Sequence, residues 1–146
     1  MRRSLTALLT VLFLGLDLQA YPVIETNPST VRPNAWTMQL PTAKVRANQQ
    51  GLPVLVAIVD SVTCSLCKSF DQLVLQQGSW SSFISQYPMF LVMLDRSKLT
   101  SAEWQSLPAP YRSGSGGLDF PTIAVHAPNG TKLTQFVATG GYGVNP

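Results

Sequence analysis

This chain of 146 residues has few of the residue types that small domains use for cross-links or metal sites. It contains two cysteines and one histidine. Zinc usually takes four protein ligands, so metal binding is a weak explanation for the cysteines. A domain of this size that depended on disulfides for stability would usually carry more of them, so we expect the hydrophobic core to hold this fold together.

Charge is also scarce, since charged residues make up 12% of the chain. The lysines and arginines are scattered along the sequence and form no basic stripe, which argues against nucleic acid as a partner. No internal repeat is present.

The first twenty residues have the pattern of a secretory signal peptide. Arg2 and Arg3 precede the apolar stretch Leu5–Leu16, and Ala20 could precede the cleavage site. The stretch is shorter than the roughly 20 apolar residues that span a membrane. We therefore expect an exported protein, either periplasmic or secreted, or in the endoplasmic reticulum lumen if the source is eukaryotic. Because Leu18 fits the small-residue rule poorly, an uncleaved membrane anchor is the alternative.

The remaining 126 residues are enough for one domain with one core. Residues 21–33 are rich in Pro, Ser, Thr and Asn, which predicts an extended arm or linker. We expect residues 34–146 to form the folded domain.

Two apolar runs predict central strands buried on both faces, Pro53–Val59 and Met89–Leu94. The alternation Trp36–Leu40 predicts a short edge strand, and Pro41–Gln50 a helix that ends at Gly51. Three tryptophans lie within apolar patterns and are expected in the core.

A second helix is expected to begin at Cys64 and run to Gly78, with Leu66, Phe70, Leu73 and Val74 on its buried face. A further short helical turn is expected over Ser79–Gln86. The capping box Thr100-Ser101-Ala102-Glu103 predicts the start of another helix.

Near the C-terminus, Phe120–His126 and Lys132–Ala138 predict a hairpin around Pro128-Asn129-Gly130, because Asn-Gly tolerates positive φ. His126, the sole histidine, is expected to be a structural or surface residue. The element order β-α-β-α-β-β predicts an α/β sandwich around a mixed sheet.

The two cysteines form a single Cys-x-x-Cys unit, Cys64 and Cys67, between a strand and a helix. Unpaired N–H groups at the helix start favour a thiolate on Cys64, and Cys67 one turn later can attack a mixed disulfide formed on it. A purely structural cross-link is disfavoured, because closing a four-residue loop contributes only about 2 kcal/mol. Redox chemistry is thus the leading hypothesis, with a structural pair and a metal site as alternatives.

This order of elements, with Cys64-Ser65-Leu66-Cys67-Lys68 after the first central strand, resembles the thioredoxin superfamily. It is most similar to exported thioredoxin-like domains such as the reducing domain of transmembrane disulfide reductases. Three further matches support the resemblance: Phe120-Pro121-Thr122 stands where the family has its cis-proline, Asn129-Gly130 at the hairpin turn, and Gly140-Gly141 after the last strand. The resemblance covers roughly residues 34–142.

The resemblance implies a thioredoxin-like three-layer sandwich that exchanges disulfides with protein substrates and a redox partner protein. Cys64 would be the nucleophile and Cys67 the resolving thiol, and no metal or organic cofactor would be needed. A cis bond before Pro121 would place the backbone of Phe120 beside an extended substrate peptide.

The chain also departs from the family pattern. The buried acid of thioredoxins would fall near Ala57 or Ile58, both apolar, and Thr63 replaces the usual aromatic residue. Because the chain stops at Pro146, we expect the C-terminal helix of the family to be missing. These departures keep a second hypothesis open, a non-catalytic binding or assembly module whose cysteine pair is permanently oxidised.

Overall fold

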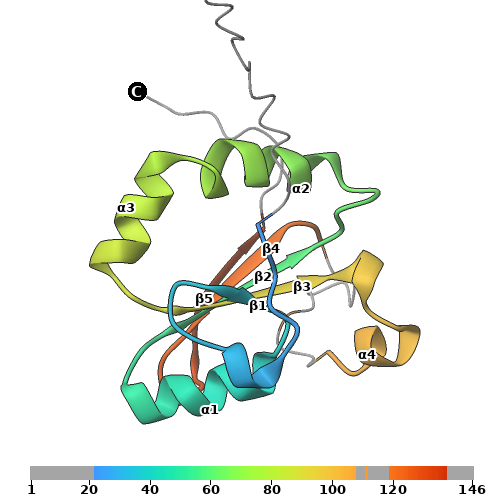
Figure 1. Cartoon of the computed structure of the whole chain (residues 1–146). Coiled ribbons are helices and arrows are strands. Elements are labelled where there is room, and N and C mark those ends of the chain that lie inside the picture. Colours follow the sequence, from blue (N-terminus) through green and yellow to red (C-terminus); the bar gives the residue numbers. More distant parts are fainter. Residues whose placement is uncertain (1–21, 108–110, 112–118, 138–146) are drawn as a thin grey trace, which may run out of the picture.

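The computed structural model describes residues 22–107, 111 and 119–137, which form one mixed sheet with helices on both faces (Figure 1). The strands are β1 (Trp36–Thr37), β2 (Val54–Val59), β3 (Phe90–Asp95), β4 (Thr122–His126) and β5 (Lys132–Val137). Their spatial order is β1-β3-β2-β4-β5. Strands β1 and β2 run parallel to β3, whereas β4 is antiparallel to β2 and β5. The expected mixed sheet with a hairpin at its end is confirmed.

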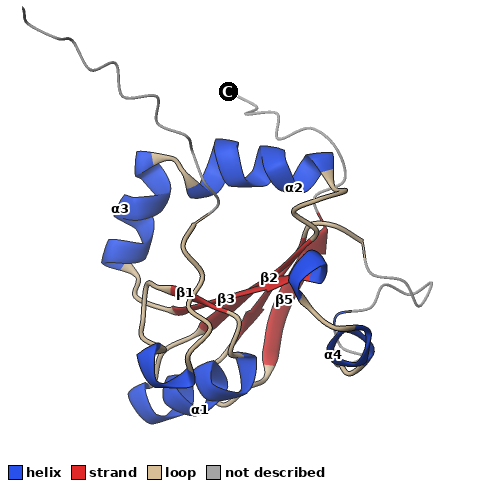
Figure 2. Ribbon diagram, turned by 45° about the vertical axis from the view of Figure 1, so that its right-hand side comes forward, coloured by secondary structure: helices blue, strands red, loops and turns tan. Residues whose placement is uncertain are grey.

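The helices form two layers, one on each face of the sheet (Figure 2). They are α1 (Leu40–Gln50), α2 (Ser65–Phe70), α3 (Gly78–Gln86) and α4 (Ser101–Gln105), with short helical turns η1 (Pro28–Thr30), η2 (Asp71–Leu75) and η3 (Arg96–Lys98). Helix α1 covers one face, and α2 and α3 cover the other. The side chains of Leu99, Trp104 and Leu107, in and around α4, pack on the α1 side. The result is the predicted three-layer arrangement.

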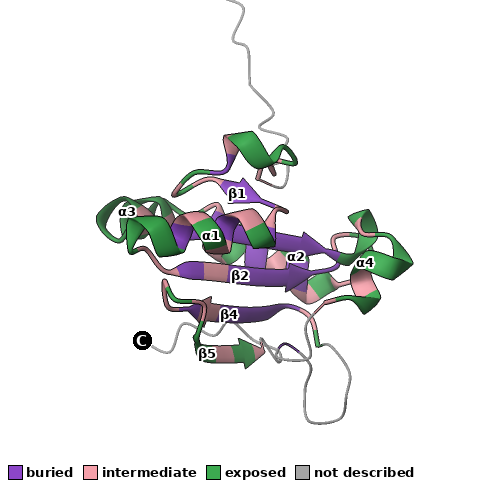
Figure 3. Ribbon diagram, turned by 90° about the horizontal axis from the view of Figure 1, so that it is seen from below, coloured by how far each residue is buried: buried purple, intermediate pink, exposed green. Residues whose placement is uncertain are grey.

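Strands β2 and β3 consist of apolar residues, except for Asp95 at the end of β3, because both of their faces are covered (Figure 3). Val56, Ile58, Val92 and Leu94 belong to the cluster under α1, and their neighbours Ala57, Val59, Leu91 and Met93 to the cluster under α2. Helix α1 presents Leu40, Ala43 and Ala47, two of them small enough to let the helix approach the sheet closely. Burial on both faces thus explains the two unbroken apolar runs in the sequence.

Residues 22–33 pack along the edge of the sheet in part. Glu25 forms a bridge with Thr37, and its amide donates to the Trp36 carbonyl at 2.8 Å. Val31 lies in the α1-side cluster and is 1% exposed. This segment therefore contributes to the core on that side of the sheet.

The helix after the cysteines is not one regular helix, and its predicted buried face is partly wrong. It changes at Asp71 into a π turn, in which the Gln76 amide bonds to the Asp71 carbonyl five residues back. The wider turn carries burial from Phe70 to Leu75 and leaves Leu73 58% exposed. The predicted end at Gly78 is also wrong, since Gly78 is the first residue of α3.

The hairpin between β4 and β5 forms as predicted. Gly130 has φ +86°, which a residue with a Cβ adopts only with strain, and its amide bonds to the Ala127 carbonyl. A register irregularity between Val125 and His126 accompanies the turn.

Several expectations concern residues outside the described ranges. These are the signal segment 1–20, Gly140-Gly141 and the missing C-terminal helix. Across the described ranges, no helix has the length and apolar character needed to cross a membrane.

Candidate functional site

Cys64 and Cys67 are joined by a disulfide at the start of α2. Cys64 is the N-cap residue, and its Sγ accepts from the Cys67 amide at 3.0 Å. Cys67 is fully buried in the α2-side cluster, whereas Cys64 is only partly buried. An external thiolate would therefore reach Cys64 Sγ, and Cys67 would be the leaving sulfur.

A tight turn connects β2 to the cysteines and contacts both of them. The Asp60 carbonyl accepts from the Cys64 amide at 3.2 Å, and the Asp60 amide donates to Cys67 Sγ at 3.5 Å. Asp60 Oδ1 accepts from the amides of Val62 at 3.1 Å and Thr63 at 2.9 Å. The hydrogen bond from Thr63 holds the pKa of Asp60 below its usual range. Asp60 therefore organises this turn as an ionised carboxylate.

The start of β4 lies beside this turn. Thr122 pairs with Ile58 in the antiparallel register, so Pro121, the residue before Thr122, lies next to the end of β2. The Phe120–Pro121 peptide bond is cis, as the resemblance implies. Pro121 is buried, and Phe120 is half-buried and packs against both core clusters. The register therefore brings Phe120 and Pro121 to the same end of the sheet as the turn that leads from β2 to Cys64.

Phe120 belongs to a stack that the sequence did not predict. Its ring lies 5.7 Å from that of Trp104, and the Arg96 guanidinium lies 5.5 Å from the Trp104 ring centroid. These residues come from η3, α4 and the loop before β4. The stack orders the surface beside Phe120.

His126 and Trp36 are buried and make packing and hydrogen-bond contacts within the fold. Buried His126 contacts the Tyr111 hydroxyl through Nε2 at 2.8 Å and the Gly130 carbonyl through Nδ1 at 3.1 Å. Trp36 is buried and stacks on Trp80 at 6.3 Å, which agrees with a packing role. In the described ranges, no three His, Cys, Asp or Glu side chains gather as a metal site would require.

One buried acid near the cysteines was not predicted from the sequence. Asp95, the last residue of β3, is 0% exposed. Its Oδ1 accepts from the Ser61 amide at 3.1 Å and from the amide and hydroxyl of Ser97. The only available sequence signal was an acid that ends an apolar strand, and this signal does not identify a partner.

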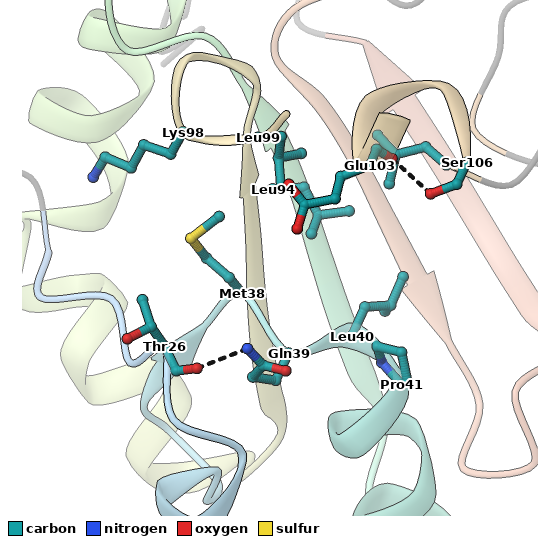
Figure 4. A pocket seen from close by; sticks show the side chains of 11 residues that line it. Thr26, Met38, Gln39, Leu40, Pro41, Leu94, Lys98, Leu99, Glu103 and Ser106 are labelled. Atoms are coloured by element: carbon teal, nitrogen blue, oxygen red, sulfur yellow. Dashed lines mark hydrogen bonds between the residues drawn. The ribbon is translucent and has the colours of Figure 1, made fainter. Parts of the chain in front are cut away.

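A separate pocket of about 570 Å³ lies between the start of α1 and the η3–α4 segment (Figure 4). Met38, Leu40, Leu94, Leu99 and Leu107 are among its apolar lining residues. Leu94 belongs to the α1-side cluster, whereas Cys67 belongs to the cluster on the opposite face of the sheet. The pocket is therefore distinct from the cysteine site.

No model of a known protein family and no curated protein sequence matches the chain. Among solved structures, it is similar to a protein described as the DsbH oxidoreductase, with a TM-score of 0.58 and 19% identity over 80% of this chain and 81% of that chain. A disulphide isomerase from Xylella fastidiosa Temecula1 matches with a TM-score of 0.49 and 17% identity, over 66% of this chain and 70% of that chain. The likeness to the first structure, together with the observed topology, shows that this chain has a thioredoxin-like fold.

Proposed function

We propose that this protein is an exported thiol–disulfide oxidoreductase that exchanges disulfides with protein substrates through Cys64 and Cys67. The observation that carries the proposal is the asymmetry of the pair. Cys64 is partly accessible at a helix start and Cys67 is buried behind it. A pair with this asymmetry can react in a fixed order.

In the reducing direction, the Cys64 thiolate attacks a substrate disulfide. A mixed disulfide forms on Cys64 and one substrate sulfur leaves as a thiolate. Cys67 then attacks Cys64 Sγ, which releases the second substrate thiol and forms the Cys64–Cys67 bond. Two electrons pass from the protein to the substrate. A dithiol partner protein returns them by the reverse steps, so the exchange requires no organic cofactor or metal.

The surface beside Cys64 suits an extended polypeptide. In the proposed complex, the backbone of Phe120 pairs with a substrate strand while Pro121 packs beneath it. Support comes from the β2–β4 register, which brings both residues to the end of β2 where the cysteine turn begins. The stack of Phe120 on Trp104 would keep this backbone in place.

The proposed compartment rests on the N-terminal sequence. Cleavage after Ala20 would release the arm and the domain into an oxidising compartment, where substrate disulfides occur. Mass spectrometry of the protein recovered from a secreting host should give the mass of residues 21–146. Recovery of the full-length mass from the membrane fraction would contradict cleavage.

The activity is tested with purified protein in insulin reduction and in reactivation of a scrambled disulfide substrate. We expect turnover by the wild type and none by Cys64→Ser. Cys67→Ser should accumulate a mixed disulfide on Cys64, detectable by mass under non-reducing conditions, because the resolving thiol is absent.

Equal rates for the wild type and Cys64→Ser would contradict the proposal. That result would favour the binding or assembly module, in which the cysteine pair stays oxidised. Stoichiometric retention of metal by the reduced protein would favour a carrier instead.

A further inference from the structure

Asp95 connects β3 to the turn that holds the disulfide. Its carboxylate Oδ1 accepts hydrogen bonds from the Ser61 amide at 3.1 Å, the Ser97 amide at 3.1 Å and the Ser97 hydroxyl at 2.8 Å. The hydroxyls of Ser61 and Ser97 also lie 2.9 Å apart. One buried oxygen therefore ties the first part of the turn after β2 to η3.

Asp95 lies on the same face of the sheet as Cys67. It is the register partner of Val59, and Val59 and Met93 both pack in the cluster that contains Cys67. Parallel partners and residues two apart share a face of the sheet. The Asp95 side chain therefore lies on the face of the sheet that α2 covers.

The second oxygen of Asp95, Oδ2, is buried and is engaged only in a long ion pair among the described residues. Among the described residues, Oδ2 makes no hydrogen bond, although the Lys98 ammonium lies 4.0 Å away. A buried carboxylate with an unsatisfied oxygen costs free energy. The carboxylate is therefore held mainly through Oδ1, whose donors lie in the cysteine turn and in η3.

The turn that Asp95 holds supplies a donor to the buried sulfur. The Asp60 amide points at Cys67 Sγ from 3.5 Å, and Ser61 is the next residue along the chain. When an external thiolate attacks Cys64 Sγ, a new S–S bond forms on Cys64, the Cys64–Cys67 bond breaks and Cys67 leaves with the electron pair. A hydrogen bond to this developing thiolate is stronger than one to the neutral disulfide sulfur.

We infer that Asp95 is a positioning residue: by holding Ser61, it keeps the Asp60 amide aimed at Cys67 Sγ and so stabilises Cys67 as a leaving thiolate. This inference rests on the proposed exchange at Cys64 and Cys67. Asp95 itself takes no part in bond making, and its effect passes through the backbone of the turn.

The test compares two variants that both remove the charge. Asp95→Asn keeps an oxygen that accepts the Ser61 and Ser97 amides, whereas Asp95→Ala removes this anchor. We expect glutathione to open the disulfide of Asp95→Asn at a rate within about threefold of the wild type. We expect the rate for Asp95→Ala to be at least about tenfold lower than for Asp95→Asn.

The reduction potential provides a readout that general destabilisation does not move in a defined direction. Loss of the donor disfavours the reduced form, so the equilibrium constant for reduction of Asp95→Ala should be about tenfold below that of Asp95→Asn. This factor corresponds to a potential about 30 mV lower. Asp71→Asn is the matched control, a buried acid after α2 that bonds to Gln76 and not to the turn, and its opening rate should equal the wild-type rate.

Ser97→Ala keeps the test decisive if Asp95→Ala does not fold. Ser97 is exposed, and its hydroxyl contacts both Asp95 and Ser61. We expect its opening rate to be about threefold below that of the wild type. Equal rates and potentials for Asp95→Ala and Asp95→Asn, or a wild-type rate for Ser97→Ala, would overturn the inference.

These readouts use glutathione and need no protein substrate. Failure of the wild type to reduce insulin would count against the proposed function, whereas the ranking of the Asp95 variants is measured independently. The two failures are therefore distinguishable.

Discussion

Residues of the same type have different tasks in this protein because their surroundings differ. Asp60 and Asp95 are both buried next to the cysteine turn, but their carboxylates accept different amides. Asp60 accepts hydrogen bonds from amides in its own turn. Asp95, at the end of β3, accepts one from Ser61 in the turn that follows β2. Asp71 is buried after α2, where its Oδ1 makes no hydrogen bond with the described residues. Burial alone therefore does not identify the acid that acts on the site, but the bonded partner does.

Titration of His126 should make the free energy of unfolding depend on pH. Burial lowers the pKa of this histidine below its usual 6.5. As pH falls below about 6.5, the unfolded chain takes up a proton that the folded chain still excludes, so stability is lost until the folded pKa is passed. Denaturant titrations should show the free energy of unfolding of the wild type falling between pH 7.5 and 5.

The control for this prediction is His126→Asn, which has no group that titrates in that range. Its free energy of unfolding should lie below the wild-type value at pH 7.5, and the difference should shrink on acidification. A constant difference across the range would show that His126 titrates equally in both states.

At the scale of elements, the π turn η2 is the least regular part of the helix that follows the cysteines. It brings Asp71 into the interior, where Gln76 Nε2 donates to Oδ2 at 2.6 Å. Asp71 Oδ1 and Gln76 Oε1 are both buried and make no hydrogen bond with the described residues. Because both acceptors lack a donor, this turn lowers the stability of the folded state at neutral pH.

Asp71→Asn should therefore stabilise the protein at pH 7, by about 1 kcal/mol in the free energy of unfolding. The asparagine removes a buried charge, and its amide nitrogen takes the place of the unsatisfied Asp71 Oδ1 and can donate to a neighbouring acceptor such as Gln76 Oε1. Burial raises the pKa of Asp71 above 3.8, so the folded wild type binds a proton more readily than the unfolded chain. The wild type should then gain stability relative to the variant as pH falls from 7 to about 4. Lower stability of the variant at every pH would contradict this account.

Elements defined by local patterns were predictable from the sequence. The two apolar runs, the Asn-Gly hairpin and the capping box at Thr100 all depend on neighbouring residues, and all are present. The π turn was not predictable, because periodicity assumes hydrogen bonds between residues four apart and Leu73 fitted that spacing.

The site divides in the same way. The cysteine pair and the cis bond before Pro121 could be predicted, the first from spacing and the second from the resemblance. The contribution of Asp95 depends on its register with Val59, 36 residues earlier, and on the turn that follows Val59. The stack of Arg96, Trp104 and Phe120 likewise joins three separate segments. No local pattern encodes such pairings.

At the scale of the whole molecule, the hydrophobic core supplies the stability, whereas the disulfide serves the proposed exchange reaction. Within the described residues the core consists of two clusters, one on each face of the sheet. Together they include all apolar residues of β3 and every residue of β2 except Leu55, which is partly buried and packs against the α2-side cluster. The disulfide closes a loop of only four residues within one turn. A protein that opens and closes this bond during turnover must remain folded in both states, so stability has to come from the core.

The double variant Cys64→Ser/Cys67→Ser should therefore fold, with a free energy of unfolding lower than that of the oxidised protein by about 2 kcal/mol for the lost cross-link, plus the cost of a hydroxyl at the buried position 67. The reduced wild type should lie between these values or match the double variant, because it lacks the same cross-link. Denaturant titration followed by circular dichroism measures all three, and Asp95→Asn, with its disulfide intact, controls for changes beside the turn. If the reduced wild type and the double variant were both unfolded, the disulfide would be a structural brace, and repeated exchange at Cys64 would be incompatible with a stable fold. A folded double variant would instead mean that the cysteine pair is free to cycle without endangering the two clusters that support it.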